Sequence, residues 1–482
     1  MREFASTSVF YNSACKQLVI VLTLICRPFD RYRVTAIYSP ACPSPAPLSA
    51  TTLIQRIGAA FSGLPDARGQ SNNRRYEMED AALSAFAIFF TQSPSFLDSQ
   101  VRMQKQQGKN NAASLFGVHQ IPCDNQIRNL LDPVPPETLF PLMATISDEL
   151  YRDGYLEHFR SINHTFLIAL DGTDFFSSEK ISCPCCTQTT LKNGKTLNRH
   201  IAVTPVLVAP SQKNVVALPP QFVQPQDGHD KQDCELAAAG RWLAQWGAHY
   251  APWGITCLGD DLYCHQPHCA RVLEHHADFL FTCKPESHVT LYEWVADLSR
   301  NGGVTTRVRT RRTGKKVFTD TWRYVNEVPL RNSDDALMVN WCELVTTDAD
   351  GKLLFHNAWA TSHRITDENV AELATAGRAR WKIENENNNT LKTKGYHFEH
   401  NFGHGNQHLS NLFATLILLA FLAHRTLDWI DAPYRTVRGA LPSRRTFFEH
   451  LRALIQYLPF DDWNHLMQFM IHRLNPEPID TG

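Results

Sequence analysis

The hydrophobic and polar positions of this 482-residue chain change their period along the sequence. From Thr52 to about Phe159, apolar residues recur at three- and four-residue steps between turn-rich segments, which predicts a helical region. At Thr165 the pattern changes to the apolar run TFLIALDGTDFF, which predicts a strand ending at Asp171 and Gly172. A hairpin follows, with a KNGK turn and a second strand, IAVTPVLVAP. A strand and hairpin of this kind open the RNase H type of sheet.

Farther along, WGITCLGDDLY predicts another strand, whose end carries Asp260 and Asp261. Residues 291–365 then contain β-rich runs separated by turns at Thr313–Gly314 and Asp350–Gly351, which predict antiparallel strands. We therefore expect an α/β protein, with a mixed sheet flanked by helices, a β-rich insertion and an N-terminal helical domain.

The stretch RARWKIENENNNTLKTKGYHFEHNFGH, residues 378–404, predicts an exposed helix that carries acids in a basic setting. Helical spacing places Trp381, Ile383 and Leu391 on an inward face. On another face, residues recur at four-residue steps, namely Arg380, Glu384 and Asn388. A solvated charged helix gives the same pattern.

Composition adds two constraints. Lys plus Arg number 47 against 48 Asp plus Glu, so any basic surface is local. Thirteen cysteines in a chain of this length do not make a disulfide scaffold, which favours a reducing, cytoplasmic location. The apolar runs Leu18–Cys26 and Ala414–Ala423 are too short to span a bilayer, so we expect no membrane segment.

Two local patterns suggest contacts with DNA. The segment SLFGVHQIPCDNQIRNLLD resembles a helix-turn-helix that presents Gln126 and Arg128, although a small helical bundle gives similar spacing. The second pattern is a cationic hairpin suited to phosphate, or to a solvated edge strand. Its cations are Arg307, Arg309, Arg311, Arg312, Lys315 and Lys316.

Three acids end or occupy separate elements: Asp171, Asp260 and Glu384. Carboxylate oxygens suit Mg²⁺ or Mn²⁺, and two such ions about 4 Å apart assist phosphoryl transfer. Asp261 and Glu386 are the alternative acids.

Three blocks, LIALDGT, LGDDLY and RARWKIENENNNTLK, together resemble the insertion-sequence DDE transposases, in the branch with a Tyr-Arg-Glu-Lys signature. The match places the family's acids on Asp171, Asp260 and Glu384 and its Arg on Arg380. The chain departs from the signature where Tyr is expected, at Gly377. It departs again where Lys is expected, at Leu391, which Lys392 follows.

The resemblance implies an RNase H-like catalytic domain with two Mg²⁺ or Mn²⁺ ions. The implied partners are double-stranded DNA, as terminal inverted repeats and target DNA, and a second copy of the chain in a homodimer. Arg380, Lys392 and Lys394 are the implied phosphate contacts beside the acids. Trp322, Trp341 and Trp359 are candidates for stacking on a flipped base.

The chain is expected to divide into six segments. In order, these are residues 1–52, a disordered or aberrantly started leader; 53–160, a helical DNA-binding domain; 161–290, the first part of the RNase H-like core; 291–365, the β-rich insertion; 366–432, the rest of the core with the Glu helix; and 433–482, a C-terminal helical segment.

Cysteine spacing suggests a structural zinc site. Cys183 and Cys186 have Cys-x-x-Cys spacing, and Cys264 and Cys269 follow the second acidic pair, so the strands of the two aspartates bring the four thiols within reach. His200 follows the hairpin as a further candidate. Ordinary reduced thiols are the alternative.

The leading interpretation is a transposase that cleaves DNA at the ends of an insertion sequence and transfers the strand into target DNA. A metal-dependent nuclease without strand transfer uses the same chemistry. A helix-turn-helix or zinc-stabilised DNA-binding protein without catalysis would make the acids incidental.

Overall fold

The computed structural model describes residues 8–12, 17–21, 49–69, 75–105, 108–225 and 234–474. The chain divides into two compact units, residues 1–46 and 47–482. In the first unit, β1 (Ser8–Asn12) and β2 (Gln17–Val21) pair antiparallel. The other residues of the predicted leader, up to residue 48, lie outside the described residues.

The second unit contains a nine-stranded mixed sheet. Five of its strands are β3 (Phe166–Ala169), β7 (Val206–Val208), β8 (Val216–Ala217), β10 (Ile255–Gly259) and β11 (Asp278–Thr282). They lie in the order β8-β7-β3-β10-β11, with β3, β10 and β11 parallel and β7 and β8 antiparallel to their neighbours. Because the parallel strands need crossovers, α7 (Glu235–Tyr250) precedes β10 and α8 (Gln266–Glu274) joins β10 to β11. The expected α/β class, with a mixed sheet flanked by helices, is confirmed.

The chain between the strands of the main sheet also forms a smaller sheet. It contains β4 (Gly172–Ser178), β5 (Thr187–Thr190), β6 (Thr196–Val203) and β9 (Gln221–Phe222). The first strand, β3, ends before Asp171 as predicted, and β4 of the small sheet begins at Gly172. A second break, which was not predicted, divides the expected strand IAVTPVLVAP between β6 and β7 at Thr204 and Pro205. Pro205 has no N–H to offer a ladder, which explains the second break.

The β-rich insertion extends the main sheet instead of forming one of its own. Its strands are β12 (Thr305–Thr313), β13 (Lys316–Pro329), β14 (Met338–Asp348) and β15 (Leu353–Thr361), paired antiparallel as predicted. β15 continues the pairing onto β11, and β12 is the edge strand. The first residues of the predicted insertion form a helix that the pattern did not predict, α9 (Val289–Arg300), which buries Leu291 and Val295.

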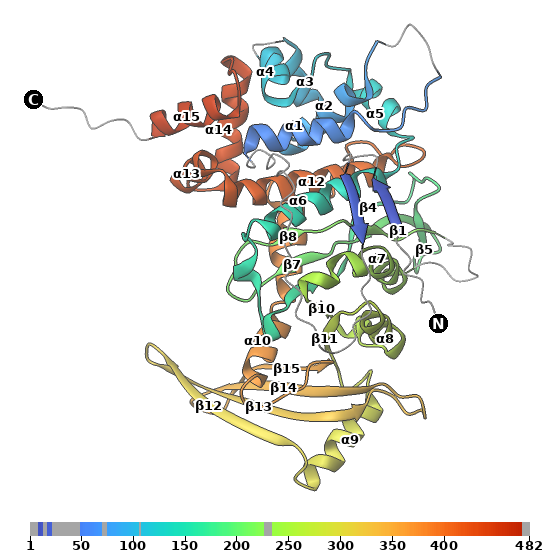
Figure 1. The fold of residues 1–482 in the computed structure, drawn as a ribbon, viewed down its shortest axis with the longest axis vertical. Coiled ribbons are helices and arrows are strands. Elements are labelled where there is room, and N and C mark those ends of the chain that lie inside the picture. Colours follow the sequence, from blue (N-terminus) through green and yellow to red (C-terminus); the bar gives the residue numbers. More distant parts are fainter. Residues whose placement is uncertain are drawn as a thin grey trace, which may run out of the picture. The chain divides into compact units, whose positions relative to one another are not determined.

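Helices form the other end of the unit (Figure 1). The N-terminal ones are α1 (Ala50–Phe61), α2 (Met78–Phe90), α3 (Phe96–Lys105), α4 (Gly108–Phe116), α5 (Asp124–Leu131) and α6 (Phe140–Arg152). The C-terminal ones are α12 (Leu409–Ile430), α13 (Ala432–Ala440), α14 (Arg444–Tyr457) and α15 (Trp463–Leu474).

Helix α12 contains the apolar run Ala414–Ala423 and extends beyond it at both ends. By length and composition it is the one helix among the described residues that matches a membrane span, but 83% of its most apolar window is buried inside the protein. It contacts α2, α6 and β8. Its apolar composition is thus explained by its place in the core.

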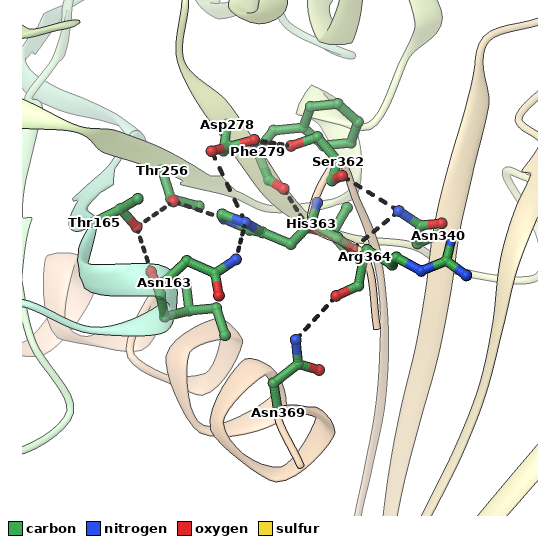
Figure 2. A network of polar contacts seen from close by, with 12 residues as sticks. Asn163, Thr165, Thr256, Asp278, Phe279, Asn340, Ser362, His363, Arg364 and Asn369 are labelled. Carbon is green, nitrogen blue, oxygen red and sulfur yellow. Dashed lines mark hydrogen bonds and ion pairs between the residues drawn. The ribbon is translucent and has the colours of Figure 1, made fainter. Parts of the chain in front are cut away.

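A buried polar network fastens the amino ends of the parallel strands to the end of β15 (Figure 2). Asn163 donates to Nδ1 of His363 at 3.0 Å, and Nε2 of His363 lies 2.9 Å from the hydroxyl of Thr256. That hydroxyl is 2.6 Å from the hydroxyl of Thr165 on the chain entering β3. Burial lowers the pKa of His363, which favours the neutral ring that this pattern requires.

Replacing Thr256 with Val is expected to lower the free energy of unfolding by about 1–3 kcal/mol, because two buried polar partners lose their hydrogen bond. Thr310→Val, at an exposed position of β12, is the matched control and should change it by less than about 0.5 kcal/mol. Denaturant unfolding measures both variants. Equal effects would show that the network does not stabilise the strand ends.

Candidate active site

Asp171 lies at the corner where the chain leaves the main sheet for the small one. Its backbone carbonyl accepts from the N–H of Thr204 at 3.1 Å, so the two strand breaks face each other. Its side chain is half-buried, and its Oδ2 accepts from the amide of Asn388 at 3.2 Å. The same Asn388 accepts from the hydroxyl of Thr204 at 2.9 Å. A strand end and a distant helix therefore fix this carboxylate together.

Asp260 lies just beyond the carboxyl end of β10, next to the strand that carries Asp171. Its Oδ1 accepts from the N–H of Leu262 at 2.9 Å and caps a short 3-10 helix, Asp261–Tyr263. That turn brings the Tyr263 ring against Gly259, where an added Cβ would lie 2.7 Å from ring atoms. The spacing of Asp260 and Tyr263 in the LGDDLY block thus has a local structural basis.

Glu235, at the start of α7, joins the two aspartate-bearing segments. Its Oε1 accepts from the Tyr263 hydroxyl at 2.6 Å and from the N–H of Gly172 at 2.8 Å. Gly172 suits this contact, because a Cβ would lie 2.4 Å from the Glu235 carboxylate and would displace it. Glu235 was not among the site residues predicted from the sequence.

The Glu-bearing segment is a helix of changing pitch. It consists of α10 (Val370–Arg378), a turn, a π-helical segment (Ile383–Asn388) and α11 (Asn389–Thr393). The expected inward positions Ile383 and Leu391 are fully buried, but Trp381 is 48% exposed, so its prediction was wrong. The turn and the wider π-helix shift the phase that a regular helix would keep.

The other predicted face of this helix does point to the acids. Arg380 donates to Glu384 at 2.7 Å, and Asn388 reaches Asp171. These three positions follow the expected four-residue steps, and they bring a third acid to the two strand ends.

The site holds more negative than positive charge. Burial raises the pKa of Asp171 to about 7; Glu235 adds to the rise, Arg380 opposes it, and Glu384 and Asp260 raise it further. The carboxylates form no compact group with ligand atoms within 4.8 Å in the described part of the chain. The arrangement is open instead of a closed cage for one ion.

The alternative acids have other partners. Asp261 accepts from the N–H of Lys284 at 2.7 Å and from the Ser287 hydroxyl, and its Oδ1 lies 3.4 Å from His288. Glu386 acts electrostatically on Lys382. Asp260 and Glu384, and not these neighbours, act on Asp171.

The departure from the family signature at Gly377 has a steric cause. The indole of Trp359, on β15, occupies the space beside it, and a Cβ on Gly377 would lie 2.4 Å from the ring nitrogen. Trp322, Trp341 and Trp359 are 3%, 1% and 0% exposed. The expectation that they stack on a flipped base is therefore wrong, because the sheet and its covering helices bury all three rings.

Some of the predicted DNA-binding residues contact other parts of the protein, and others are exposed. Arg128 is used inside the protein, donating to the carbonyl of Phe402 at 2.9 Å and to Asp124 at 3.0 Å, while Gln126 is half-buried beside it on α5. Lys392 pairs with Glu399 at 2.9 Å, and Lys394 is exposed.

Along β12 every residue is exposed. Arg311 pairs with Asp320 at 2.7 Å, and Arg309 lies 3.8 Å from the same carboxylate. The other predicted cations of this hairpin form no ion pair with a described carboxylate within 4.0 Å; they are Arg307, Arg312, Lys315 and Lys316.

The cysteines do not assemble as the sequence suggested. Cys183 and Cys186 lie with His200 and His404, whereas Cys264 lies with Cys283 and His288. Cys269 belongs to neither group. The predicted set of four cysteines is wrong because Cys183 and Cys186 follow β4 into the small sheet, whereas Cys264 and Cys269 follow β10 in the main one.

No protein-family model matches this sequence, and no curated protein matches it. Among solved structures, the chain is similar to a piggyBac transposase, determined by cryo-electron microscopy as a synaptic complex with hairpin DNA. The TM-score is 0.34 with 10% sequence identity, over 89% of this chain and 79% of that chain. At this distance the likeness is coarse.

Asp171→Asn is expected to stabilise the metal-free protein. Because the folded-state pKa of Asp171, about 7, exceeds the unfolded value, the folded state binds an extra proton between about pH 4 and 7 and loses stability as pH rises through that window. At pH 8 in EDTA, the variant should raise the free energy of unfolding by about 1–4 kcal/mol. This gain should shrink toward pH 5.

The control is Asp174→Asn, since Asp174 pairs with Arg199 across the small sheet. It should be neutral or destabilising at both pH values. Two results would contradict the conclusion that burial and neighbouring carboxylates destabilise ionised Asp171. One is an equal gain in the free energy of unfolding for Asp174→Asn and Asp171→Asn, and the other is no gain for Asp171→Asn at pH 8.

Proposed function

We propose that this protein is a metal-dependent DNA transposase of the DDE type, in the branch with the Tyr-Arg-Glu-Lys signature. Its catalytic acids are Asp171, Asp260 and Glu384. The observation that carries the proposal is their convergence: two adjacent parallel strand ends and a helix more than a hundred residues later supply acids that interact at one place. The motif spacing and the electrostatic influence of Asp260 and Glu384 on Asp171 both support these three residues.

The donor set fits hard divalent cations. All the groups are oxygen donors, and several carboxylates face a single guanidinium, that of Arg380, so a cation is needed to balance them. Two Mg²⁺ or Mn²⁺ ions, held by Asp171, Asp260 and Glu384, would fit this charge. Such ions, when bound, favour attack by an oxygen nucleophile on a phosphodiester and stabilise the leaving oxygen.

The surrounding residues hold these acids in place. Arg380 orients Glu384 and Asn388 orients Asp171, while the contact from Tyr263 to Glu235 fixes the start of β4 beside Asp171. Asp171 accepts from neutral Asn388, so this contact places no positive charge on its carboxylate in competition with a cation. These residues are therefore positioning residues.

The proposed substrate is double-stranded DNA, first as terminal inverted repeats and then as target. The exposed cations of β12 and the following turn, with Lys394 beside the Glu helix, offer contacts to phosphate without base specificity. A homodimer that holds two DNA ends, and a cytoplasmic location, complete the proposal.

Cleavage of a labelled terminal repeat with Mg²⁺ tests the acids. Asp171→Asn, Asp260→Asn and Glu384→Gln should each lower the rate at least ~10³-fold, since removing a ligand forfeits several kcal/mol of charge stabilisation. Glu386→Gln is the matched control, two residues from Glu384 on the same helix, and should retain most activity. Cleavage that survives the first three substitutions would overturn the assignment, and cutting without a joined product would favour a nuclease.

Binding of a DNA duplex tests the edge strand. Arg312→Ala combined with Lys316→Ala should weaken binding and reduce the slope of log K against log salt by about two, because each phosphate that a cation no longer neutralises removes about one unit. Arg331→Ala, whose exposed side chain pairs with Asp335 between β13 and β14, should leave the slope unchanged. If the wild type and both variants give the same slope, the duplex binds a surface other than this edge strand.

A further inference from the structure

Four potential ligands from distant parts of the chain meet beside the small sheet. Cys183 and Cys186 lie between β4 and β5, His200 lies on β6, and His404 lies in the loop after α11. Their ligand atoms all lie within 4.8 Å of one another. Cys186, His200 and His404 are buried and Cys183 is partly buried, so the group is closed to most of the solvent.

The distances match the edges of a tetrahedron around zinc. Zn–S bonds of about 2.3 Å and Zn–N bonds of about 2.0–2.1 Å at tetrahedral angles give edges of about 3.8 Å for S–S, about 3.6 Å for S–N and about 3.4 Å for N–N. The structure has 3.8 Å between the two sulfurs. Cys183 and Cys186 lie 3.5 and 3.3 Å from Nε2 of His200, and the two histidine Nε2 atoms are 3.1 Å apart.

Hydrogen bonding prepares His404 as a ligand. Its Nδ1 lies 3.0 Å from the carbonyl of Gly405. A carbonyl only accepts, so Nδ1 carries the proton and the lone pair of Nε2 points toward the sulfur of Cys186, 3.3 Å away. This is the outer contact typical of a metal-ligating histidine.

We propose that Cys183, Cys186, His200 and His404 bind one structural Zn²⁺ ion. Two thiolates and two neutral imidazoles balance the ion's charge, which suits a buried site, and binding releases the two thiol protons to solvent. Four protein ligands leave no open position, so the ion is structural and not catalytic.

The ion ties two segments that flank the carboxylates. β4 begins at Gly172, directly after Asp171, and is paired with β6, which carries His200. His404 belongs to the loop that follows the Glu helix. Zinc would therefore fasten the hairpin leaving Asp171 to the segment leaving Glu384.

The N-terminal helical region holds in place the loop that carries His404. The Asp132 carboxylate accepts from the N–H groups of Asn406 at 2.9 Å and Gln407 at 3.0 Å, and Arg128 holds the carbonyl of Phe402. Arg128 and Asp132 thus set the loop so that His404 reaches the cysteines, a role that the helix-turn-helix interpretation did not foresee.

Metal analysis of the full chain tests the site independently of any activity on DNA. Protein purified under reducing conditions should contain about one zinc ion per chain, and Co²⁺ exchanged into it should give the intense visible bands of tetrahedral thiolate coordination. Cys186→Ser and His404→Gln should lose the ion. Cys185→Ser, next to a ligand but outside the group, and Cys269→Ser should keep it.

Limited trypsin digestion of the same proteins reports what the ion holds. Removing zinc from the wild type should speed cleavage at Lys180, Lys192 and Lys195, which are exposed on the hairpin between β4 and β6. Circular dichroism separates metal loss from unfolding.

If the substituted proteins fail to fold, the wild-type metal content and Co²⁺ spectrum decide the matter. A wild type without zinc, a Co²⁺ spectrum without tetrahedral thiolate bands, or zinc that survives His404→Gln but not Cys269→Ser would overturn the proposal.

Discussion

Crowding of carboxylates around Asp171 is the constraint on which the rest of the site depends. The chain turns from one sheet to another there, and the turn leaves a half-buried carboxylate next to Glu235, Asp260 and Glu384, with Arg380 as the opposing charge. Burial and like charges both disfavour ionisation, so the metal-free fold carries this arrangement at a cost in stability. The proposed divalent cation would remove this cost, which would couple ion binding to the stability of the core.

Several local features hold the carboxylates in that arrangement. The π-helical segment Ile383–Asn388 brings Glu384 and Asn388 to the strand ends, and helices of this kind often occur at functional sites. Glycines at 172 and 259 allow the Glu235 carboxylate and the Tyr263 ring to approach so closely that a Cβ at either position would displace them. At the opposite ends of the same strands, the His363 network fixes their amino ends. Strands held at both ends give the acids a rigid base.

Elements with strong local periodicity were predictable from the sequence. The core strands and the antiparallel insertion followed from alternation and turn residues. Features that depend on long-range packing were not. The exposure of Trp381 comes from a change of helical pitch, and the space at Gly377 is filled by Trp359 from a strand 18 residues earlier. His404 joins cysteines more than two hundred residues before it, and no local pattern announces such a partner.

Anomalous scattering from a crystal grown with Mn²⁺ tests the central claim most directly. The account predicts Mn²⁺ peaks contacting the carboxylates of Asp171, Asp260 and Glu384, and their loss in the Asp171→Asn protein. Peaks bound instead by Asp261 or Glu386, or no Mn²⁺ at the strand ends in well-ordered crystals, would contradict it.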